Sequence, residues 1–322
     1  MFKNRSVLVA GGTGLIGRPL VEMLLERGAK VRVVSLDDAS RAPAGSEFQR
    51  LDLTDPAACA QACDGIEFVF QLCGVKGSPA VSTTRPASFI TPTVLFSFHL
   101  LEAARRCGVK RYLFTSSIAV YSPAEVLRED DVWSTFPSPN DRVPGWAKRL
   151  CELQVESYRV EYGWEDLYIV RPANTYGPYD NFDLQNAMVV PSIVRRAVDG
   201  ENPLVVWGDG SARRDFIHAR DVAAGMLTVF EQRCSKPVNL GSGVGTSIRE
   251  LVDVVTAQLD SPPRVEWDTS KPRGDAMRVM DMTRARALGI APSVSLEAGI
   301  RETIDWYAQN RQTGAGRYDV FR

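Results

Sequence analysis

The sequence of 322 residues predicts an α/β fold with a doubly wound parallel sheet and a smaller C-terminal α/β substrate lobe. In the first half, short apolar runs alternate with longer runs whose apolar residues recur at helical spacing, which is typical of a parallel sheet covered by helices. From Pro172 onward the predicted strands and helices become shorter. We therefore expect a sheet domain over residues 1–172, a lobe mainly over 173–308 with some segments returning to the first domain, and a polar tail over 309–322.

The first predicted unit is a buried strand around Val7–Val9, a glycine-containing turn and an amphipathic helix. Gly11 provides the positive φ of a tight turn, Gly14 lets a pyrophosphate approach the backbone, and Gly17 lets the helix pack against the sheet. The N-terminus of the helix then faces the anion. This arrangement predicts a Rossmann-type dinucleotide site rather than a merely flexible turn. Its expected cofactor-binding residues are Gly11, Gly14, Leu15, Ile16 and Gly17.

The second strand, predicted over Lys30–Leu36, ends where the adenosine ribose of a dinucleotide would lie. Ser35 and Asp37 lie at its end, and Arg41 follows after a short gap. A carboxylate here accepts hydrogen bonds from the ribose hydroxyls and favours NAD, whereas Ser35 with Arg41 would accommodate the 2′-phosphate of NADP. The choice between NAD and NADP stays open, and Arg41 by itself equally fits a solvated polar loop.

The third strand ends near Asp52, whose carboxylate can reach the adenine amino group, with Leu53 beside it. The fourth strand is predicted over Phe68–Leu72, and Leu72 lies at the same edge of the sheet. These three residues, with Ser35 and Asp37, are further expected cofactor-binding residues. The region from Val75 to Pro92 is rich in Gly, Ser, Thr and Pro, which predicts an irregular loop over the cofactor.

Composition argues against several other classes of protein. With 38 basic and 39 acidic residues, the chain has no charge footprint for nucleic acid or an anionic membrane. The six cysteines are scattered and lack zinc-site spacing, so they predict reduced thiols of a cytoplasmic protein. No apolar run is expected to reach the ~18 residues of a membrane span. The two histidines, His99 and His218, are expected to be structural, and no metal site is predicted.

The carboxyl ends of the later strands carry distinctive motifs, at the edge where doubly wound sheets bind ligands. A helix over Thr93–Cys107 leads to a strand over Arg111–Thr115, which ends in SSIAVY and includes Ser117. A further strand, over Leu167–Val170, ends in RPANTYGP and includes Asn174. Between these two strands, the sequence GWAK opens a long amphipathic helix and ends at Lys148.

These motifs, the glycine turn, and GDG followed by RDF within 208–216 resemble those of the extended short-chain dehydrogenase/reductase family. More narrowly, they resemble the NAD-dependent epimerases and dehydratases of nucleoside-diphosphate sugars. The sequences YGPYDNF (176–182) and IREL (248–251) are most similar to GDP-L-fucose synthase-like members. The resemblance covers nearly the whole chain. It implies NAD or NADP as cofactor, a nucleoside-diphosphate sugar as substrate and a homodimer formed through paired helices.

The resemblance also implies roles for single residues. Ser117 would hydrogen-bond a sugar hydroxyl or carbonyl, and Lys148 would hold the nicotinamide ribose. Two arginines would clamp the substrate diphosphate with paired donors, and a tryptophan would stack on the base unless it belongs to the core. Taken singly, these residues would also fit a strand-end cap, a solvated helix cation or surface ion pairs. The expected substrate-binding residues are Asn174, Trp207, Arg214 and Arg278.

The chain departs from the family pattern four residues before Lys148, where Pro144 replaces the family's catalytic tyrosine. Losing a positioned general acid or base typically costs ~10²–10⁴ in rate. Ile118 and Tyr179 stand roughly where fucose-synthase-like members carry an acid/base cysteine and histidine. We therefore expect an enzyme with altered proton-transfer residues, with Tyr179 as the candidate, or a member that binds both ligands as a sensor or scaffold. Packing within its Gly-Pro loop is the alternative role for Tyr179.

Overall fold

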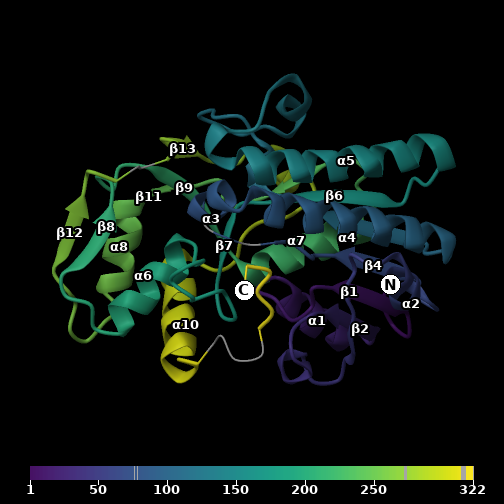
Figure 1. Cartoon of the computed structure of the whole chain (residues 1–322), viewed down its shortest axis with the longest axis horizontal. Coiled ribbons are helices and arrows are strands. Elements are labelled where there is room, and N and C mark those ends of the chain that lie inside the picture. Colours follow the sequence, from purple (N-terminus) through teal and green to yellow (C-terminus); the bar gives the residue numbers. More distant parts are fainter. Residues whose placement is uncertain (76, 78, 272–273, 313–316, 322) are drawn as a thin grey trace.

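The computed structural model describes residues 1–75, 77, 79–271, 274–312 and 317–321, and it contains the expected parallel sheet (Figure 1). Seven strands, all parallel, lie in the order β10-β6-β5-β4-β1-β2-β3. Since β10 comes from the second half of the chain, a segment of that half returns to this sheet. The strands are β1 (Ser6–Ala10), β2 (Lys30–Ser35), β3 (Glu47–Arg50), β4 (Phe68–Gln71), β5 (Arg111–Thr115), β6 (Leu167–Pro172) and β10 (Val238–Leu240).

Helices cover both faces of this sheet because side chains alternate along each strand. Val7 and Val9 of β1 belong to a buried cluster with α1 and α7, whereas Leu8 and Ala10 belong to a second cluster with α2, α4 and α5. The sheet is therefore doubly wound, as predicted. The helices of this domain are α1 (Gly17–Glu26), α2 (Pro56–Cys63), α3 (Pro79–Thr84), α4 (Pro86–Arg106), α5 (Arg142–Tyr162) and α7 (Ala219–Glu231). Four short 3-10 helices are η1 (Ala39–Arg41), η2 (Ile118–Val120), η3 (Glu129–Ser134) and η4 (Pro139–Asp141).

The remaining elements, apart from α9, which packs with the main sheet, form a smaller lobe beside the carboxyl edge of the sheet (Figure 1). It contains a sheet with the path β11-β9-β13, in which β7 also pairs with β9, and the parallel pair β12-β8. A third buried cluster joins α6, α8 and α10. These remaining elements are β7 (Asn174–Tyr176), α6 (Val189–Val198), β8 (Leu204–Trp207), β9 (Arg213–His218), β11 (Gly245–Ser247), α8 (Ile248–Thr256), β12 (Val265–Asp268), β13 (Met277–Arg278), α9 (Thr283–Ala287) and α10 (Leu296–Gln309).

The irregular loop predicted from Val75 to Pro92 is wrong. This region contains α3 and the first turns of α4, which begins at Pro86 and continues through Pro92. Proline at the start of a helix is compatible with it, because the first N–H groups have no partner within the helix. The prediction rested on the Gly, Ser, Thr and Pro content of the segment and therefore missed two helices that begin at proline.

Helix α4 is also more apolar than the sequence analysis expected. It is the one helix in the described chain that is long and apolar enough to cross a membrane by length and composition. A core helix passes the same test, and Leu100, Leu101 and Ala104 of α4 are buried in the cluster shared with α2 and α5. His99, on the same helix, forms a 2.9 Å hydrogen bond with the carbonyl of Thr54 through Nδ1, in agreement with a structural role.

Candidate functional site

The glycine turn between β1 and α1 has the geometry that a dinucleotide requires. Gly11 has φ +85°, and a Cβ on it would lie 3.1 Å from the backbone of Leu72 and Cys73. A Cβ on Gly17 would lie 2.7 Å from Gly12 Cα and even closer to Gly11 O, so this glycine allows the helix to touch the turn. Of the residues that the structure describes, a Cβ on Gly14 would meet only Gly11 O, at 3.4 Å, and they leave space for a ligand there. The three glycines thus have the surroundings that their predicted roles require.

The N-terminus of α1 is open toward this space. Its N-cap residue is Ile16, and no described side chain caps the helix. The first N–H groups of a helix lack partners within it and carry the positive end of its dipole. An uncapped helix start beside a glycine with free space fits a phosphate. Leu15 and Ile16, expected to bind cofactor, lie at this position, with Leu15 largely buried.

At the end of β2, Asp37 lies within a small polar network. Thr13 donates to Asp37 Oδ2 at 2.6 Å and contacts Ser35 Oγ at 2.9 Å. Arg41 Nε lies 3.7 Å from the same carboxylate, and the backbone N–H of Tyr318 donates to Asp37 Oδ1 at 2.7 Å. The structure therefore joins the three residues expected near the adenosine ribose. It adds Thr13, which its place between Gly12 and Gly14 could have signalled.

The other expected adenosine contacts lie near the ends of β3 and β4. Asp52 Oδ1 accepts hydrogen bonds from the backbone and hydroxyl of Thr54, at 2.9 and 2.8 Å, in an exposed turn after β3. Leu53 is buried, and Leu72 follows β4 in a half-buried position. The Asp52 carboxylate thus accepts hydrogen bonds within its own turn. A hydrogen bond from an adenine amino group to this carboxylate stays a prediction.

Ser117 and Lys148 lie together at the end of β5. Lys148 Nζ donates to the carbonyl of Thr115 at 2.8 Å and lies 4.8 Å from the centre of the Phe114 ring. Burial lowers the pKa of Lys148. Ser117 Oγ accepts from the N–H of Ala119 at 3.1 Å, so its own proton remains for another acceptor. A single described hydrogen bond uses Lys148 Nζ, which leaves two of its N–H groups for a ligand.

Pro144 occupies the first turn of α5, where the missing N–H is tolerated. Residues 144 and 148 are one turn apart, so their side chains lie on the same face of the helix. The neighbouring Gly145 fixes this turn, because a Cβ there would lie 2.5 Å from the Cβ of Pro137. The position at which the resemblance implies a tyrosine is therefore on the same helix face as Lys148, and Pro144 has no titratable group there.

Arg214 and Arg278 are paired across neighbouring strands. They are register partners of the parallel strands β9 and β13. Burial and, next, the positive charge of Arg278 lower the pKa of Arg214. Two like charges in opposed positions destabilise a sheet, and a bound anion would relieve the repulsion. The structure thus brings together the two arginines expected to clamp a diphosphate.

This arginine pair lies beside Ser117. Arg278 Nη2 donates to the carbonyl of Ile118 at 2.9 Å, and Nη1 pairs closely with Asp141, which precedes α5. Arg214 Nη1 donates to the carbonyl of Asp275 at 2.7 Å. Asp141 was not singled out from the sequence, although its place just before the helix of Lys148 was a usable signal. Hydrogen bonds and an ion pair within the chain therefore hold both arginines in place.

The other two expected substrate residues differ in their surroundings. Asn174 donates through Nδ2 to the carbonyl of Asp215 at 2.9 Å and so ties β7 to β9. Trp207, at the end of β8, is 61% exposed and therefore does not belong to the core. Lys271 Nζ lies 5.8 Å from the centre of its ring. The exposed indole fits the predicted role of stacking on a base, which stays a prediction.

Tyr179 packs between the two lobes. The guanidinium carbon of Arg18 lies 4.2 Å from the centre of its ring, and the ring centroid of Trp306 lies at 4.8 Å. Its backbone has φ +66°, which is uncommon for a residue other than glycine. Its ring contacts in the described chain are thus with α1 and α10, not with Ser117 or Lys148. The packing role is therefore visible, while the catalytic role stays a prediction.

His218 is structural, as expected, and it predicts a pH effect on stability. It caps α7 by accepting from the N–H of Arg220 at 3.3 Å, and it is 2% exposed. Burial lowers its pKa below 6.5, despite Glu302 at 3.7 Å. Below pH ~6.5 the unfolded chain binds more protons than the folded one, so the free energy of unfolding rises with pH up to this value and then levels off.

Replacing His218 should remove this dependence. His218→Asn keeps a capping side chain. It is expected to lessen the pH slope of the unfolding free energy by up to about 1.4 kcal/mol per pH unit below pH ~6.5. Urea unfolding of both proteins over this range measures the slopes. Equal slopes in the two proteins would show that His218 is not the group responsible.

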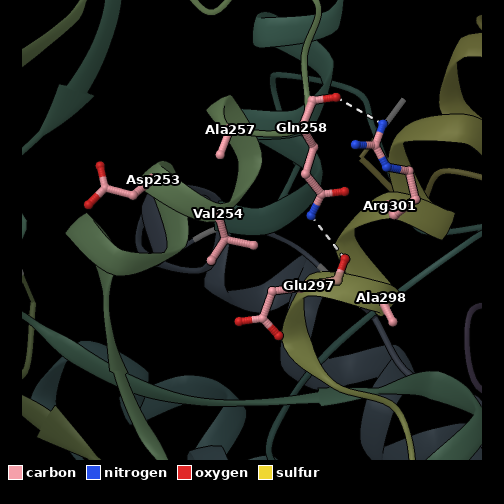
Figure 2. Close-up of a pocket in the computed structure, with 7 residues that line it drawn as sticks. All are labelled: Asp253, Val254, Ala257, Gln258, Glu297, Ala298 and Arg301. Atoms are coloured by element: carbon pink, nitrogen blue, oxygen red, sulfur yellow. Dashed lines mark hydrogen bonds between the residues drawn. The ribbon is translucent and has the colours of Figure 1, made fainter.

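The smaller lobe also has a hollow that is separate from these residues. It is a groove between α8 and α10, and the side chain of Gln258 crosses it to donate to the carbonyl of Glu297 at 2.9 Å (Figure 2). None of its lining residues belongs to the expected site. Within the described ranges, no group of three or more His, Cys, Asp or Glu residues could hold a metal ion. All six cysteines are free thiols.

Comparison with known proteins gives matches along nearly the whole chain. GDP-L-fucose synthase of Escherichia coli (strain K12) is 30% identical over 334 residues, which cover 98% of this chain and 100% of that protein. dTDP-4-dehydro-6-deoxy-D-allose reductase of a Streptomyces species is 30% identical over 325 residues, covering 97% and 98%. The structure of UDP-glucose 4-epimerase of Thermus thermophilus in complex with NAD matches with a TM-score of 0.81 and 28% identity, covering 94% of this chain and 98% of that one.

The family assignment follows from these matches together with the glycine turn and the parallel sheet. Residues 7–241 match the model of the NAD dependent epimerase/dehydratase family. This range includes β1 from Val7 onward, the glycine turn, Ser117, Lys148 and Arg214. The chain therefore belongs to the NAD-dependent epimerase/dehydratase family of enzymes.

Proposed function

We propose that this chain is an NAD(P)-dependent enzyme that epimerises, dehydrates or reduces a nucleoside-diphosphate sugar with atypical proton-transfer residues. The observation that carries the proposal is the 2.9 Å hydrogen bond from Arg278 to the carbonyl of Ile118. It places the arginine pair next to Ser117, on the same strand end that receives Lys148. Groups suited to a diphosphate, a sugar oxygen and a nicotinamide ribose thus lie in one region.

The proposed roles follow from the donors that each side chain has left. Bound NAD(P) supplies a hydride donor or acceptor at its nicotinamide ring. Lys148 holds the nicotinamide ribose with its two remaining N–H groups, and Ser117 donates its hydroxyl proton to an oxygen of the sugar. Arg214 and Arg278 neutralise the diphosphate with charge-assisted hydrogen bonds. The relatives named above act on GDP-, dTDP- and UDP-linked sugars, which supports the substrate class without choosing the base.

Proton transfer is the step for which the family tyrosine is missing. Tyr179 is the candidate from the sequence, yet its ring contacts Arg18 and Trp306. Tyr179→Phe keeps this packing and removes only the hydroxyl. On the observed contacts we expect kcat to stay within about threefold of the original. A loss of ~10²–10⁴ would instead assign the proton transfer to Tyr179. Single-turnover kinetics with a nucleoside-diphosphate 4-keto sugar measure the difference.

A binding function without turnover is the second candidate, and Pro144 favours it. In that case the chain would bind cofactor and sugar nucleotide as a sensor or scaffold. Conversion of a GDP-, UDP-, CDP- or dTDP-sugar by the pure protein, abolished by Lys148→Ala, would rule this candidate out. Binding of both ligands with no conversion would support it.

The proposed cofactor and substrate class can be tested on the protein as purified. Mass spectrometry of co-purifying ligands is expected to detect a nicotinamide dinucleotide, and the masses would distinguish NAD from NADP. Added NAD or NADP is expected to raise the melting temperature by mass action. Absence of any bound dinucleotide together with no thermal shift would overturn the proposal.

A homodimer in the cytoplasm completes the proposal. Large apolar side chains stay exposed along α4 and α5, which supports pairing of these helices with a second copy. They are Leu95, Leu150, Leu153 and Val160. The free cysteines agree with a reducing compartment.

A further inference from the structure

The last described residues of the chain, 317–321, form a C-terminal tail that lies against both lobes. Tyr318 donates its backbone N–H to Asp37 Oδ1 at 2.7 Å, and Asn186 Nδ2 donates to Asp319 Oδ2 at 3.1 Å. Arg85 Nη1 donates to the carbonyl of Phe321. The chain ends near the middle of the molecule, between α10 and α1, rather than at its periphery (Figure 1). Three separate hydrogen bonds thus fix the tail in place.

The tail runs in the direction that a dinucleotide takes across this fold. One of its contacts, Asp37, follows β2, and a second contact, Gly77, follows β4, where a Cβ would lie 3.2 Å from the Phe321 ring. Strand β1 lies between β2 and β4 in the sheet and ends at the glycine turn. Dinucleotides bind across the carboxyl ends of such strands, with their phosphates at this turn. The tail therefore spans the same edge from the adenosine side toward the nicotinamide side.

The chain that leads to the tail borders the same end of the site. A cavity of about 560 Å³ is lined by Arg18, Arg41 and Tyr179 on one side and by 308–312 on the other. Arg41 also lies beside Asp37. The segment after α10 is thus adjacent to the adenosine end before the tail reaches Asp37.

At Asp37 the tail contacts a residue that is expected to bind the cofactor. Oδ1 of Asp37 accepts from Tyr318, and Oδ2 accepts from Thr13 at 2.6 Å, so both carboxylate oxygens already have donors. The ribose hydroxyls of NAD need the same oxygens. Among the described residues, a Cβ on Gly14 would meet only Gly11 O, so these residues leave space beside this glycine. Each carboxylate oxygen can accept a further hydrogen bond, but the backbone N of Tyr318 lies 2.7 Å from Oδ1, so the tail occupies space that the adenosine ribose would need at Asp37.

We propose that the C-terminal tail is an autoinhibitory segment that takes the place of the adenosine ribose at Asp37 and is displaced when the dinucleotide binds. The inference rests on the proposed role of Asp37 in holding that ribose. A competing segment lowers the apparent affinity of the cofactor by the fraction of molecules in which the site is free. Removal of the tail therefore tightens cofactor binding, and cofactor binding frees the tail.

Three variants test the competition. The first is a chain that ends at Gln312, and the second is Tyr318→Pro, which removes the N–H that reaches Asp37. The matched control is Tyr318→Ala, which keeps this N–H and changes only a half-exposed side chain. Calorimetric titration with NADH and NADPH is expected to show Kd lowered about fivefold or more in the first two variants and unchanged in the control. Unchanged or weaker binding by the chain ending at Gln312 would overturn the proposal.

A second measurement uses the full chain. Trypsin cleaves after arginine, and Arg317 begins the tail. Saturating NAD is expected to speed cleavage at Arg317, whereas protection by NAD would show that the tail closes over the cofactor and would overturn the competition. If neither the full chain nor the chain ending at Gln312 binds a dinucleotide, the proposed function fails as well. If both bind with equal affinity, only the autoinhibitory role fails.

Discussion

Pro144→Tyr is expected to raise kcat on a nucleoside-diphosphate 4-keto sugar by ~10²–10⁴, the usual contribution of a positioned general acid. The position lies in the first turn of α5, one turn before Lys148 and on the same face of the helix. The N–H that tyrosine adds lies in this first turn, where a helix provides no internal partner, so the helix accepts it. The half-buried Lys148 ammonium next to it would lower the pKa of the new phenol by its positive charge.

The control for this gain is Pro144→Phe, which adds the ring without the hydroxyl. Both variants relieve the same backbone restriction, so only the phenol separates them. Single-turnover oxidation of NADPH or NADH measures the rate, and kcat of the tyrosine variant should fall at acidic or alkaline pH according to which protonation state of the phenol is required. Equal rates for the two variants would mean that proton transfer does not limit the reaction or that another group performs it.

Two glycine substitutions separate cofactor binding from folding. Gly14→Ala adds a methyl group that, within the described chain, meets only Gly11 O, at 3.4 Å, on a backbone without positive φ. It is expected to leave the unfolding free energy within about 0.5 kcal/mol while it raises the Kd for NAD ~10-fold or more, about 1.4 kcal/mol. Gly17→Ala places its methyl 2.7 Å from Gly12 Cα. It is expected to cost about 1–3 kcal/mol of stability through overpacking.

Urea unfolding and NAD titration of the same two variants test this contrast. We expect opposite profiles, with Gly14→Ala stable but weak in binding and Gly17→Ala unstable. Normal NAD affinity in Gly14→Ala would show that the dinucleotide does not approach the turn at this glycine. Unchanged stability in Gly17→Ala would show that the helix can move away from the turn at little cost.

The sequence was sufficient to predict those structural features whose physical cause lies in residues adjacent in the chain. The glycine turn could be predicted because strand, turn and helix are adjacent in the chain and each glycine has a separate steric reason. The strand at Arg111–Thr115 and the helix of Lys148 were likewise readable from their periodicity. The prolines at 79 and 86 misled the prediction, because proline ends a helix in its interior but fits its start.

Contacts between distant segments could not be derived from the residues alone. Arg214 and Arg278 lie opposite each other because of the register of β9 and β13, which the sequence does not reveal. Their roles were suggested only by the resemblance to a family. The bond between Tyr318 and Asp37 joins residues 281 positions apart, and no local pattern marks it. Tyr179 illustrates the limit of a motif, because the loop motif indicated its position while the packing of Arg18 and Trp306 decided its neighbours.

Transfer of a deuteron from the cofactor to the sugar would distinguish an enzyme from a binding protein. The protein would be incubated with NADH and NADPH carrying deuterium in both C4 positions of the nicotinamide and with GDP-, UDP- and dTDP-linked 4-keto sugars. We expect mass spectrometry to find one deuteron in a sugar product, and Lys148→Ala to abolish it. Binding of both ligands without deuterium in any sugar, and without any other converted sugar, would contradict an enzymatic role and leave a protein that only binds them.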